Sequence, residues 1–463
     1  MTPCEGVKGG VSMASPTRPT ASPEQRPIRR ACALDLMQLS TDLGAVPNQV
    51  GAVLMLDARR GFDPVGAVAI LRDRIERVPR LRQRLHRLPV GCGRPIWVDD
   101  PRFDLARHVT VVAVPGDGDD AALLDLAAAR VTTPLPMSRP LWSATLVTGL
   151  AGARVALIVV FHHVLADGLG GLAVLAHLLD APVDAASTQR FPQRPPTRRQ
   201  LRADARRSRL AALYRLPSGL REVRAAAREL SIGRMERAPR TCLNRPTGGR
   251  RRLAFVRTDL AAVRELAHAW DATVNDVVLT AVTGALRRYL LGQGEQLDEI
   301  VVSVPIAPTS GGGADPGNRH GVMLLCLPTG GRPEQRLQAV AATTHARKQG
   351  NRGASAALLA PLFRLLAAMR LLRWFIDHQR MVNTFVTNLP GPRDPVTLAG
   401  LAVTDMHLVP LATGNATVAF AVVSYAGTLT MTVVVDPDHV DDLDVLVGAL
   451  RDEFDHLAPA VAG

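Results

Sequence analysis

Residues 184–245 separate two stretches of chain in which strand-like and helix-like patterns alternate, and this division limits the fold more than any other feature. Between Arg190 and Arg240 the sequence has fifteen arginines against four acidic residues, several prolines and no strand-like run. Such a composition favours a connecting segment with some helix, here around 200–213 and 220–230. We therefore expect two lobes joined by a helical crossover linker.

Both flanking stretches have a mixed pattern, in which short apolar or β-branched runs alternate with runs of helical spacing. They are similar in size and content, although no residue-level repeat relates them. The expected fold class is therefore α/β, with mixed α+β character, in two lobes. Strands are predicted at 50–56, 109–114, 141–147, 155–161, 252–256, 299–304, 322–327, 383–388, 418–423 and 428–435, and helices at 65–85, 119–129, 259–269, 274–291 and 441–457.

At 463 residues the chain exceeds one ordinary domain, and its 47% hydrophobic and 21% charged residues indicate a folded core. Residues 1–30 are rich in Pro, Thr, Ser and Gly and lack an apolar signal core. They are expected to form a disordered tail, and Met13 is an alternative start. The expected organisation then has a first lobe at 31–183, the Arg-rich linker at 184–245 and a second lobe at 246–463.

The formal net charge of +13 comes mostly from the linker and does not form a basic face over the whole fold. Aromatic residues make up only 4% of the chain, which disfavours binding of nucleic acid by base stacking. The linker arginines fit two interpretations. They form either a solvated connecting helix or a patch that binds anionic lipid headgroups or the phosphates of coenzyme A.

The five cysteines are scattered and include no Cys-x-x-Cys pair, so neither a disulfide framework nor a zinc site is indicated, and no metal is expected. The sequence also lacks the Gly-x-Ser-x-Gly elbow of serine hydrolases and a phosphate-binding loop. We expect no bound cofactor. A reducing cytoplasm fits this composition.

No apolar run reaches the roughly 18–20 residues that a membrane-spanning helix needs. The nearest run, 356–376, contains three arginines and Pro361 and is expected to form one or two amphipathic helices. Such helices pack in the core or between lobes, or they lie in a membrane interface. The expected location is the cytoplasm, with peripheral attachment to the inner face of the membrane or to lipid inclusions as the alternative.

The residues 162–168 read His-His-x-x-x-Asp-Gly, between a strand-like run and a helix-like run. Imidazole, with a pKa of about 6.5, is the natural base for deprotonating a hydroxyl near neutral pH. A histidine at a strand end with a carboxylate four residues later suits acyl transfer from a thioester to an alcohol. Because a thioester is already activated, one histidine suffices and no covalent acyl-enzyme is needed.

Within this motif we assign His163 as the general base. Asp167 is expected to orient the loop or pair with a basic group, and Gly168 to let the backbone turn or the substrate approach. His162 is expected to be a packing or hydrogen-bonding neighbour. The alternative is that the two histidines are only satisfied polar side chains.

From about Leu34 to the C-terminus the chain resembles the bacterial wax ester synthase/diacylglycerol acyltransferase family. Six ordered blocks carry the likeness: Arg-Pro-Ile-Trp-Val-Asp-Asp at 94–100 with Phe103 to His108, Pro-Leu-Trp at 140–142, the motif at 162–168, Asn-Asp within 273–278, Gly-Asn-Arg at 317–319 and Asn-Leu-Pro-Gly-Pro at 388–392. The resemblance implies two chloramphenicol-acetyltransferase-like lobes with a channel between them, and the histidine at its middle.

The resemblance also implies that acyl-CoA is the co-substrate and that a lipid alcohol is the acceptor. It associates Asn275 with activity and Asn388 with the channel, so both are candidate substrate-binding residues. The alternative for Asn388 is that it only caps the turn before Pro390. The sequence itself offers a structural role for Asp276, in the first turn of a helix that Thr273 caps. One departure is visible, because 47–51 reads Pro-Asn-Gln-Val-Gly where the family has a Pro-Met-His-Val-Gly-like stretch. That departure concerns acceptor preference.

The expected function is therefore O-acyl transfer from long-chain acyl-CoA to diacylglycerol, or to a fatty alcohol in wax ester synthesis. Acylation of another lipid alcohol is a second enzymatic option. A non-catalytic lipid-binding or lipid-droplet protein of the same fold is the alternative from a different class. No nucleic-acid partner is expected.

Overall fold

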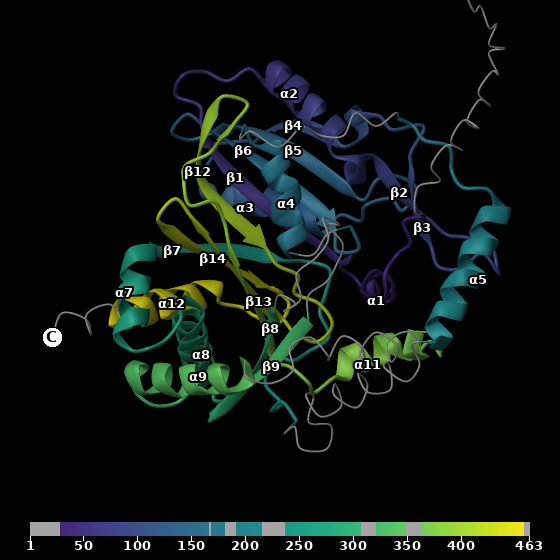
Figure 1. The fold of residues 1–463 in the computed structure, drawn as a ribbon. Helices are drawn as coiled ribbons and strands as arrows, with labels where there is room; N and C mark the ends of the chain where they lie inside the picture. Colours follow the sequence, from purple (N-terminus) through teal and green to yellow (C-terminus); the bar gives the residue numbers. More distant parts are fainter. Residues whose placement is uncertain are drawn as a thin grey trace, which may run out of the picture.

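The computed structural model describes residues 28–165, 168–180, 191–214, 237–306, 321–348, 363, 365–367 and 369–457. The predicted tail falls outside these ranges except for its last residues, and so do Asp167, the block at 317–319 and the helix expected at 220–230. Figure 1 shows two sheets, one above the other in the view, each accompanied by helices.

The first sheet has the strand order β11-β12-β1-β6-β5-β4. Its centre is antiparallel, because β1 pairs with β6 and β6 pairs with β5 in that sense, whereas β4 lies parallel to β5 at one edge. The strands are β1 (Gln49–Asp57), β4 (Val109–Ala113), β5 (Trp142–Leu150), β6 (Arg154–His162), β11 (Thr397–Leu398) and β12 (Leu401–Val409).

Apolar side chains project from both faces of this sheet, as expected for strands that are buried on both sides. One face packs on α2 and α4, and the other packs on α3. The accompanying elements are α1 (Ala33–Thr41), α2 (Pro64–Arg77), α3 (Asp120–Thr132), α4 (Gly168–Leu178), the short 3-10 helices η1 (Pro79–Arg82) and η2 (Leu105–Arg107), and the two-stranded sheet of β2 (Gln83–His86) with β3 (Ile96–Asp99).

The second sheet has the strand order β7-β14-β13-β10-β8-β9. Here β10 is the strand of interest, since it lies parallel to both β13 and β8 and ends near the first lobe. The strands are β7 (Arg252–Asp259), β8 (Glu299–Ile306), β9 (Gly321–Pro328), β10 (Thr384–Pro390), β13 (Val418–Tyr425) and β14 (Thr428–Val435).

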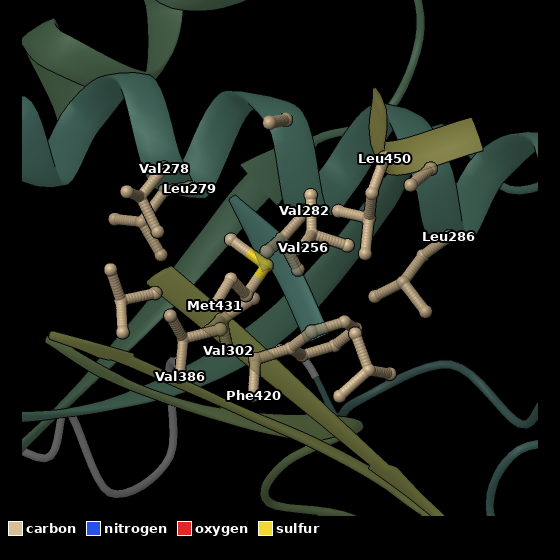
Figure 2. Close-up of a cluster of buried hydrophobic side chains, with 14 of the residues drawn as sticks. Val256, Val278, Leu279, Val282, Leu286, Val302, Val386, Phe420, Met431 and Leu450 are labelled. Carbon is tan, nitrogen blue, oxygen red and sulfur yellow. The ribbon is translucent and has the colours of Figure 1, made fainter. Parts of the chain in front are cut away.

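The helix α8 (Val274–Gly292) forms the centre of the second lobe. Figure 2 shows its side chains Val278, Val282 and Leu286 facing the strands, with Leu450 of α12 (Leu443–Leu457) beside them. Every residue of α8 from Asp276 to Leu286 is buried, because the sheet, α12 and α9 (Pro333–Lys348) all pack around it. The remaining described helices of this lobe are α7 (Leu260–Ala269) and α11 (Leu372–His378).

The linker contributes one described helix, α5 (Arg198–Tyr214), close to the predicted 200–213. It is fastened to the first lobe by an ion pair between Arg30 and Asp204 (2.6 Å), and its Leu201 is buried with β3. The helix predicted at 65–85 is shorter than expected. It ends at Arg77, because Pro79 follows and the chain turns into η1 and β2.

Strands from the C-terminal stretch of the chain enter the first sheet and so join the two lobes. The sequence-based division assigned 246–463 to the second lobe, yet β12 from that stretch pairs antiparallel with β1 from Gly51↔Val409 to Leu56↔Val403. The same strand contacts β13 and β14 of the second sheet. Within the described residues no helix combines the length and apolarity that crossing a membrane requires.

His407 on β12 marks this junction. Its side chain is fully buried and its ring stacks on Phe255 of β7, with centroids 3.6 Å apart and planes within 6°. Arg257, which pairs with Asp405, approaches the same imidazole at 3.5 Å. Burial lowers the pKa of His407, and the positive charge of Arg257 lowers it further, to about 3. This imidazole is therefore neutral at physiological pH.

We predict that His407 makes stability decrease as the pH falls. Its folded-state pKa lies below the value of about 6.5 of an exposed histidine, so the unfolded chain binds more protons between these two values. Lowering the pH from 7.5 to 5 is expected to reduce the free energy of unfolding by about 2 kcal/mol through this group, measured by urea unfolding.

The variant His407→Gln keeps a hydrogen-bond acceptor but cannot titrate, so it should lose this part of the pH dependence. His177→Gln, on α4, is the matched control and should retain it. An unchanged pH dependence in His407→Gln would contradict the prediction.

Candidate active site

The motif 162–168 begins where β6 ends. β6 lies at the centre of the first sheet between β1 and β5 and is buried along nearly its whole length, so its last residue is held on both sides. Gln49 of β1 lies opposite His162 in the register. The next residue, His163, donates its backbone N–H to the carbonyl oxygen of Asn48 (2.8 Å), and its side chain is half-buried.

His162 is 2% exposed, and both of its ring nitrogens have partners. Nδ1 accepts the backbone N–H of Val164 (3.1 Å), and Nε2 lies 3.1 Å from Oδ2 of Asp42. Because Nδ1 must accept from an amide, the neutral ring carries its proton on Nε2 and donates it to the carboxylate. His162 is therefore poorly placed to take a proton from a substrate.

Asp42 directly follows α1, and its carboxylate is a second anchor of this region. Besides His162, it accepts the backbone N–H of Asn48 at Oδ1 (2.9 Å). Partial burial by itself would raise the pKa of Asp42, but the hydrogen bonds from His162 and Asn48 outweigh it and the pKa is lowered. Asp42 is thus a carboxylate throughout the neutral range.

The motif turns tightly after the strand. The backbone N–H of Leu165 donates to the carbonyl oxygen of His162 (2.8 Å). Val164 and Leu165 are both buried in the hydrophobic core that the first sheet forms with α2 and α4. Gly168, predicted to shape the loop, is the first residue of α4. Asp167, predicted to orient the loop or to pair with a basic group, lies outside the described residues. The helix α4 packs against α2 of its own lobe and against β10 of the other.

The two predicted substrate-binding residues lie together in the second lobe. Asn388 is on β10 and Asn275 is in the first turn of α8, and the amide Nδ2 of Asn388 donates to Oδ1 of Asn275 (3.5 Å). Both side chains are half-buried. Since α4 contacts β10, the helix that follows the histidine motif and the strand that carries Asn388 meet where the lobes join.

Asp276, next to Asn275, has a structural role. It forms a capping box with Thr273, whose backbone N–H (2.8 Å) and hydroxyl (2.7 Å) both donate to Oδ2. The hydroxyl of Thr344 on α9 donates to Oδ1 (2.7 Å). Its place in the first turn of a helix capped by Thr273 agrees with the prediction from the sequence. The carboxylate, in a residue that is 2% exposed, also joins the start of α8 to α9, which the sequence did not predict.

The residues at 47–51 acquire definite roles. Gln49 is 1% exposed; its Nε2 donates to the carbonyl oxygens of Val131 and Thr133 (both 2.9 Å), and its Oε1 accepts from Leu135 (2.8 Å). This side chain therefore fastens β1 to the end of α3. Sequence reasoning missed Asn48 and Asp42, whose roles depend on contacts with the distant histidine pair.

Two other features of the described residues bear on function. No group of three or more His, Cys, Asp or Glu side chains suited to a metal ion occurs within them. A cavity of about 510 Å³ opens in the second lobe, between 238–246 and 377–380, with Glu295 and Asn415 also lining it. None of the predicted site residues lines this cavity.

Comparison with known proteins places the chain among enzymes that have this architecture. The model of the wax ester synthase/diacylglycerol acyltransferase catalytic domain matches residues 32–278, and the model of the C-terminal domain of the same enzymes matches 316–458. The chain belongs to the wax ester synthase/diacylglycerol acyltransferase family and is therefore an acyltransferase, which confirms the resemblance noted in the sequence.

Relatives and solved structures agree with this assignment. A probable diacylglycerol O-acyltransferase of Mycobacterium tuberculosis is 31% identical over 421 residues, covering 87% of this chain and 89% of that protein. A putative diacylglycerol O-acyltransferase of the same species is 31% identical over 467 residues, covering 94% and 98%.

Among solved structures, the wax ester synthase/diacylglycerol acyltransferase of Marinobacter aquaeolei VT8 is similar with a TM-score of 0.68 at 21% identity, covering 94% of this chain and all of that one. A starter condensation domain of rhizomide synthetase, solved with C8-CoA, is similar with a TM-score of 0.60 at 17% identity, covering 94% of each chain. These likenesses confirm the expected two-lobed α/β fold.

The neighbouring residues Asp276 and Asn275 provide a test of the capping role of Asp276. Asp276→Ala is expected to lower the free energy of unfolding by about 1–3 kcal/mol, because it removes the Asp276 half of the capping box and the hydrogen bond that joins Thr344 of α9 to the start of α8. Asn275→Ala, one residue earlier, removes one long, half-buried hydrogen bond with Asn388 (3.5 Å) and is expected to lower it by only about 0.5 kcal/mol, the low end for a hydrogen bond. Urea unfolding of both variants checks this, and an equal loss in both would contradict the capping role.

Proposed function

We propose that this acyltransferase moves a long-chain acyl group from acyl-CoA to the hydroxyl of diacylglycerol, with His163 as general base, and so makes triacylglycerol. A fatty alcohol, which would give a wax ester, is a second acceptor to test, and another lipid alcohol is a third. The observation that carries the proposal is the position of His163. It is half-buried and directly follows the central strand β6, and the next helix along the chain, α4, contacts the other lobe.

Within the histidine pair, the surroundings favour His163 as the base. Both ring nitrogens of His162 are engaged by Val164 and Asp42, and its side chain is almost wholly buried. A general base must reach the proton that it removes, at hydrogen-bond distance. The half-buried ring of His163 meets this requirement better than its neighbour.

The reaction requires one proton to move twice. The imidazole of His163 takes the proton of the acceptor hydroxyl while that oxygen attacks the thioester carbonyl. The tetrahedral intermediate then collapses, the carbon–sulfur bond breaks, and the thiolate of coenzyme A takes the proton from the imidazolium. Asp167 would hold the loop in place, and Asn275 and Asn388, hydrogen-bonded to each other, would contact substrate from the second lobe.

The names of the relatives support diacylglycerol as the first acceptor to try. The two mycobacterial proteins described above are named as diacylglycerol O-acyltransferases, and they match most of this chain. The condensation domain of similar fold was solved with an acyl-CoA, which makes a CoA thioester a reasonable donor for such a fold.

We predict that His163→Ala loses ester formation by at least roughly 10²-fold, the lower range for removal of a general base. Purified protein is incubated with labelled palmitoyl-CoA and either diolein or hexadecanol, and the ester product is counted. His177→Ala, a half-buried histidine on α4, is the matched control and should keep the wild-type rate.

The same assay distinguishes the alternatives. Ester from diolein, from hexadecanol or from both identifies the acceptor. Wild-type protein that binds lipid but forms no ester with any alcohol offered would support the non-catalytic lipid-binding alternative. An active His163→Ala variant would rule out the proposed base.

We further propose that the protein attaches peripherally to an anionic lipid surface at the cytoplasmic side, through α11 and the described residues just before it. Leu365, Met369, Leu371 and Trp374 are large apolar side chains that this short segment leaves exposed, and Trp374 is 63% exposed. Exposed apolar side chains gathered in this way are typical of an interaction surface.

Charges next to these apolar residues favour an anionic lipid surface as the partner. Arg370 and Arg373 are exposed in the same segment, although Arg373 pairs with Asp377 (3.5 Å). The cavity beside α11 is lined by Arg240, Arg245 and Arg380 against the acidic Glu295 and Asp377, so basic residues outnumber acidic ones here. Tryptophan, leucine and arginine together are characteristic of segments that lie in a membrane interface. The substrates proposed above dissolve in lipid, so such attachment would bring the enzyme to its acceptor.

We predict that Leu371→Ser with Trp374→Ser weakens binding to phosphatidylglycerol vesicles by at least roughly tenfold. The reason is that binding would no longer transfer these two apolar side chains from water into the lipid surface. Sedimentation with vesicles measures it. Val65→Ser with Val90→Ser removes two exposed apolar side chains elsewhere and should bind as wild type does. Equal binding of all three proteins would contradict the proposed surface.

A further inference from the structure

A single carboxylate, that of Asp42, connects the two histidines of the motif. Asp42 directly follows Thr41, the last residue of α1, and its side chain is 28% exposed. One oxygen accepts the Nε2 proton of His162, and the other accepts the backbone N–H of Asn48. No sequence motif marks it, because its partner His162 is 120 residues away.

The contact with His162 fixes the state of that ring. With Nδ1 accepting from the backbone of Val164, only a ring protonated on Nε2 satisfies both partners, and the carboxylate of Asp42 accepts that proton. The ring in turn holds the backbone of Val164, the residue after His163. The turn that carries His163 is therefore supported on its C-terminal side by the pair Asp42–His162.

The contact with Asn48 supports the turn from the other side. The backbone N–H of Asn48 donates to Oδ1 of Asp42 (2.9 Å), and the carbonyl oxygen of Asn48 accepts the backbone N–H of His163 (2.8 Å). Its side-chain Nδ2 reaches Gln38 (2.8 and 2.9 Å) and Thr41 (3.2 Å) of α1, and the side chain is only 3% exposed. Asn48 is thus fixed between Asp42, α1 and His163.

We propose that Asp42 is a positioning residue for His163. One carboxylate oxygen holds His162, whose ring accepts the backbone N–H of Val164, and the other holds Asn48, whose carbonyl oxygen accepts the backbone N–H of His163. This inference rests on the proposed role of His163 as base. Asp42 does not touch the substrate, so its effect on the reaction passes entirely through the placement of that ring.

The isosteric variant Asp42→Asn tests the proposal sharply. An asparagine at 42 offers one acceptor, which satisfies Asn48, and turns its NH₂ group toward His162. The proton on Nε2 of His162 then faces a donor, and the other tautomer would place a proton against the N–H of Val164. The ring is expected to move, and the turn that carries His163 moves with it.

Asp180 supplies a matched control. Its carboxylate is 22% exposed, it accepts backbone N–H groups of Ala399 and Gly400, and it pairs with Arg74. Its pKa is also lowered, with burial opposed by the hydrogen bonds that it accepts. It lies just beyond the C-terminal end of α4, whereas the motif lies at the N-terminal end. Asp180→Asn therefore removes a similar anchor without touching the motif.

For Asp42→Asn we expect kcat to fall about 10²-fold with KM within about threefold of wild type, because misplacement of a catalytic group by about 1 Å costs rate of this order. Asp180→Asn should keep kcat within about threefold. Imidazole ¹⁵N spectra should show the Nε2–H tautomer of His162 in wild type and in Asp180→Asn, and its loss in Asp42→Asn.

The outcomes separate this inference from the proposed function. If His163→Ala is inactive while Asp42→Asn keeps kcat within about threefold of Asp180→Asn, the positioning role is wrong and the base stands. If His163→Ala remains active, the proposed base itself fails. A drop in kcat of the same size in both aspartate variants would indicate general destabilisation and would also overturn the positioning role.

Discussion

The pairing of β12 with β1 is the interaction on which the rest of the structure depends. A strand from the C-terminal stretch completes the sheet of the N-terminal lobe, and its register is continuous apart from a shift near Leu56. The same strand places His407 against Phe255 and Asp405 against Arg257 of the second sheet. The lobes therefore cannot separate without breaking backbone hydrogen bonds in the interior of a sheet, and leaving such groups unpaired is costly.

This constraint assembles the candidate site from both lobes. The first lobe brings the histidines at the end of β6, and α4 carries the chain from them against β10. The second lobe brings Asn388 and Asn275, already hydrogen-bonded to each other. Since neither lobe has both sets of residues, the proposed reaction needs the intact two-lobed enzyme. It also follows that neutral His407, deep in the junction, makes the relation between the lobes sensitive to acid.

The sequence predicted the elements that depend on neighbouring residues, but not the contacts between residues far apart in the chain. Strands such as β6 and helices such as α8 follow from apolar runs and periodicity, and the capping of α8 follows from Thr273 and Asp276 three residues apart. β12 was not predicted, because Thr404, Asp405 and His407 interrupt its apolar pattern. Two of those polar residues, Asp405 and His407, make contacts across the junction, so the irregularity that hid the strand reflects its position between two sheets.

The segment 47–51 shows how a departure from a family pattern is interpreted differently once contacts are known. From the sequence, the absence of methionine and histidine there bears on acceptor preference. In the structure, Gln49 makes three hydrogen bonds to the end of α3 and its neighbourhood, so the change at this position concerns the attachment of β1 to α3. Asn48 instead holds His163 and the end of α1 together. Of the two positions, Asn48 makes the direct backbone contact with His163, and its own backbone N–H is held by Asp42.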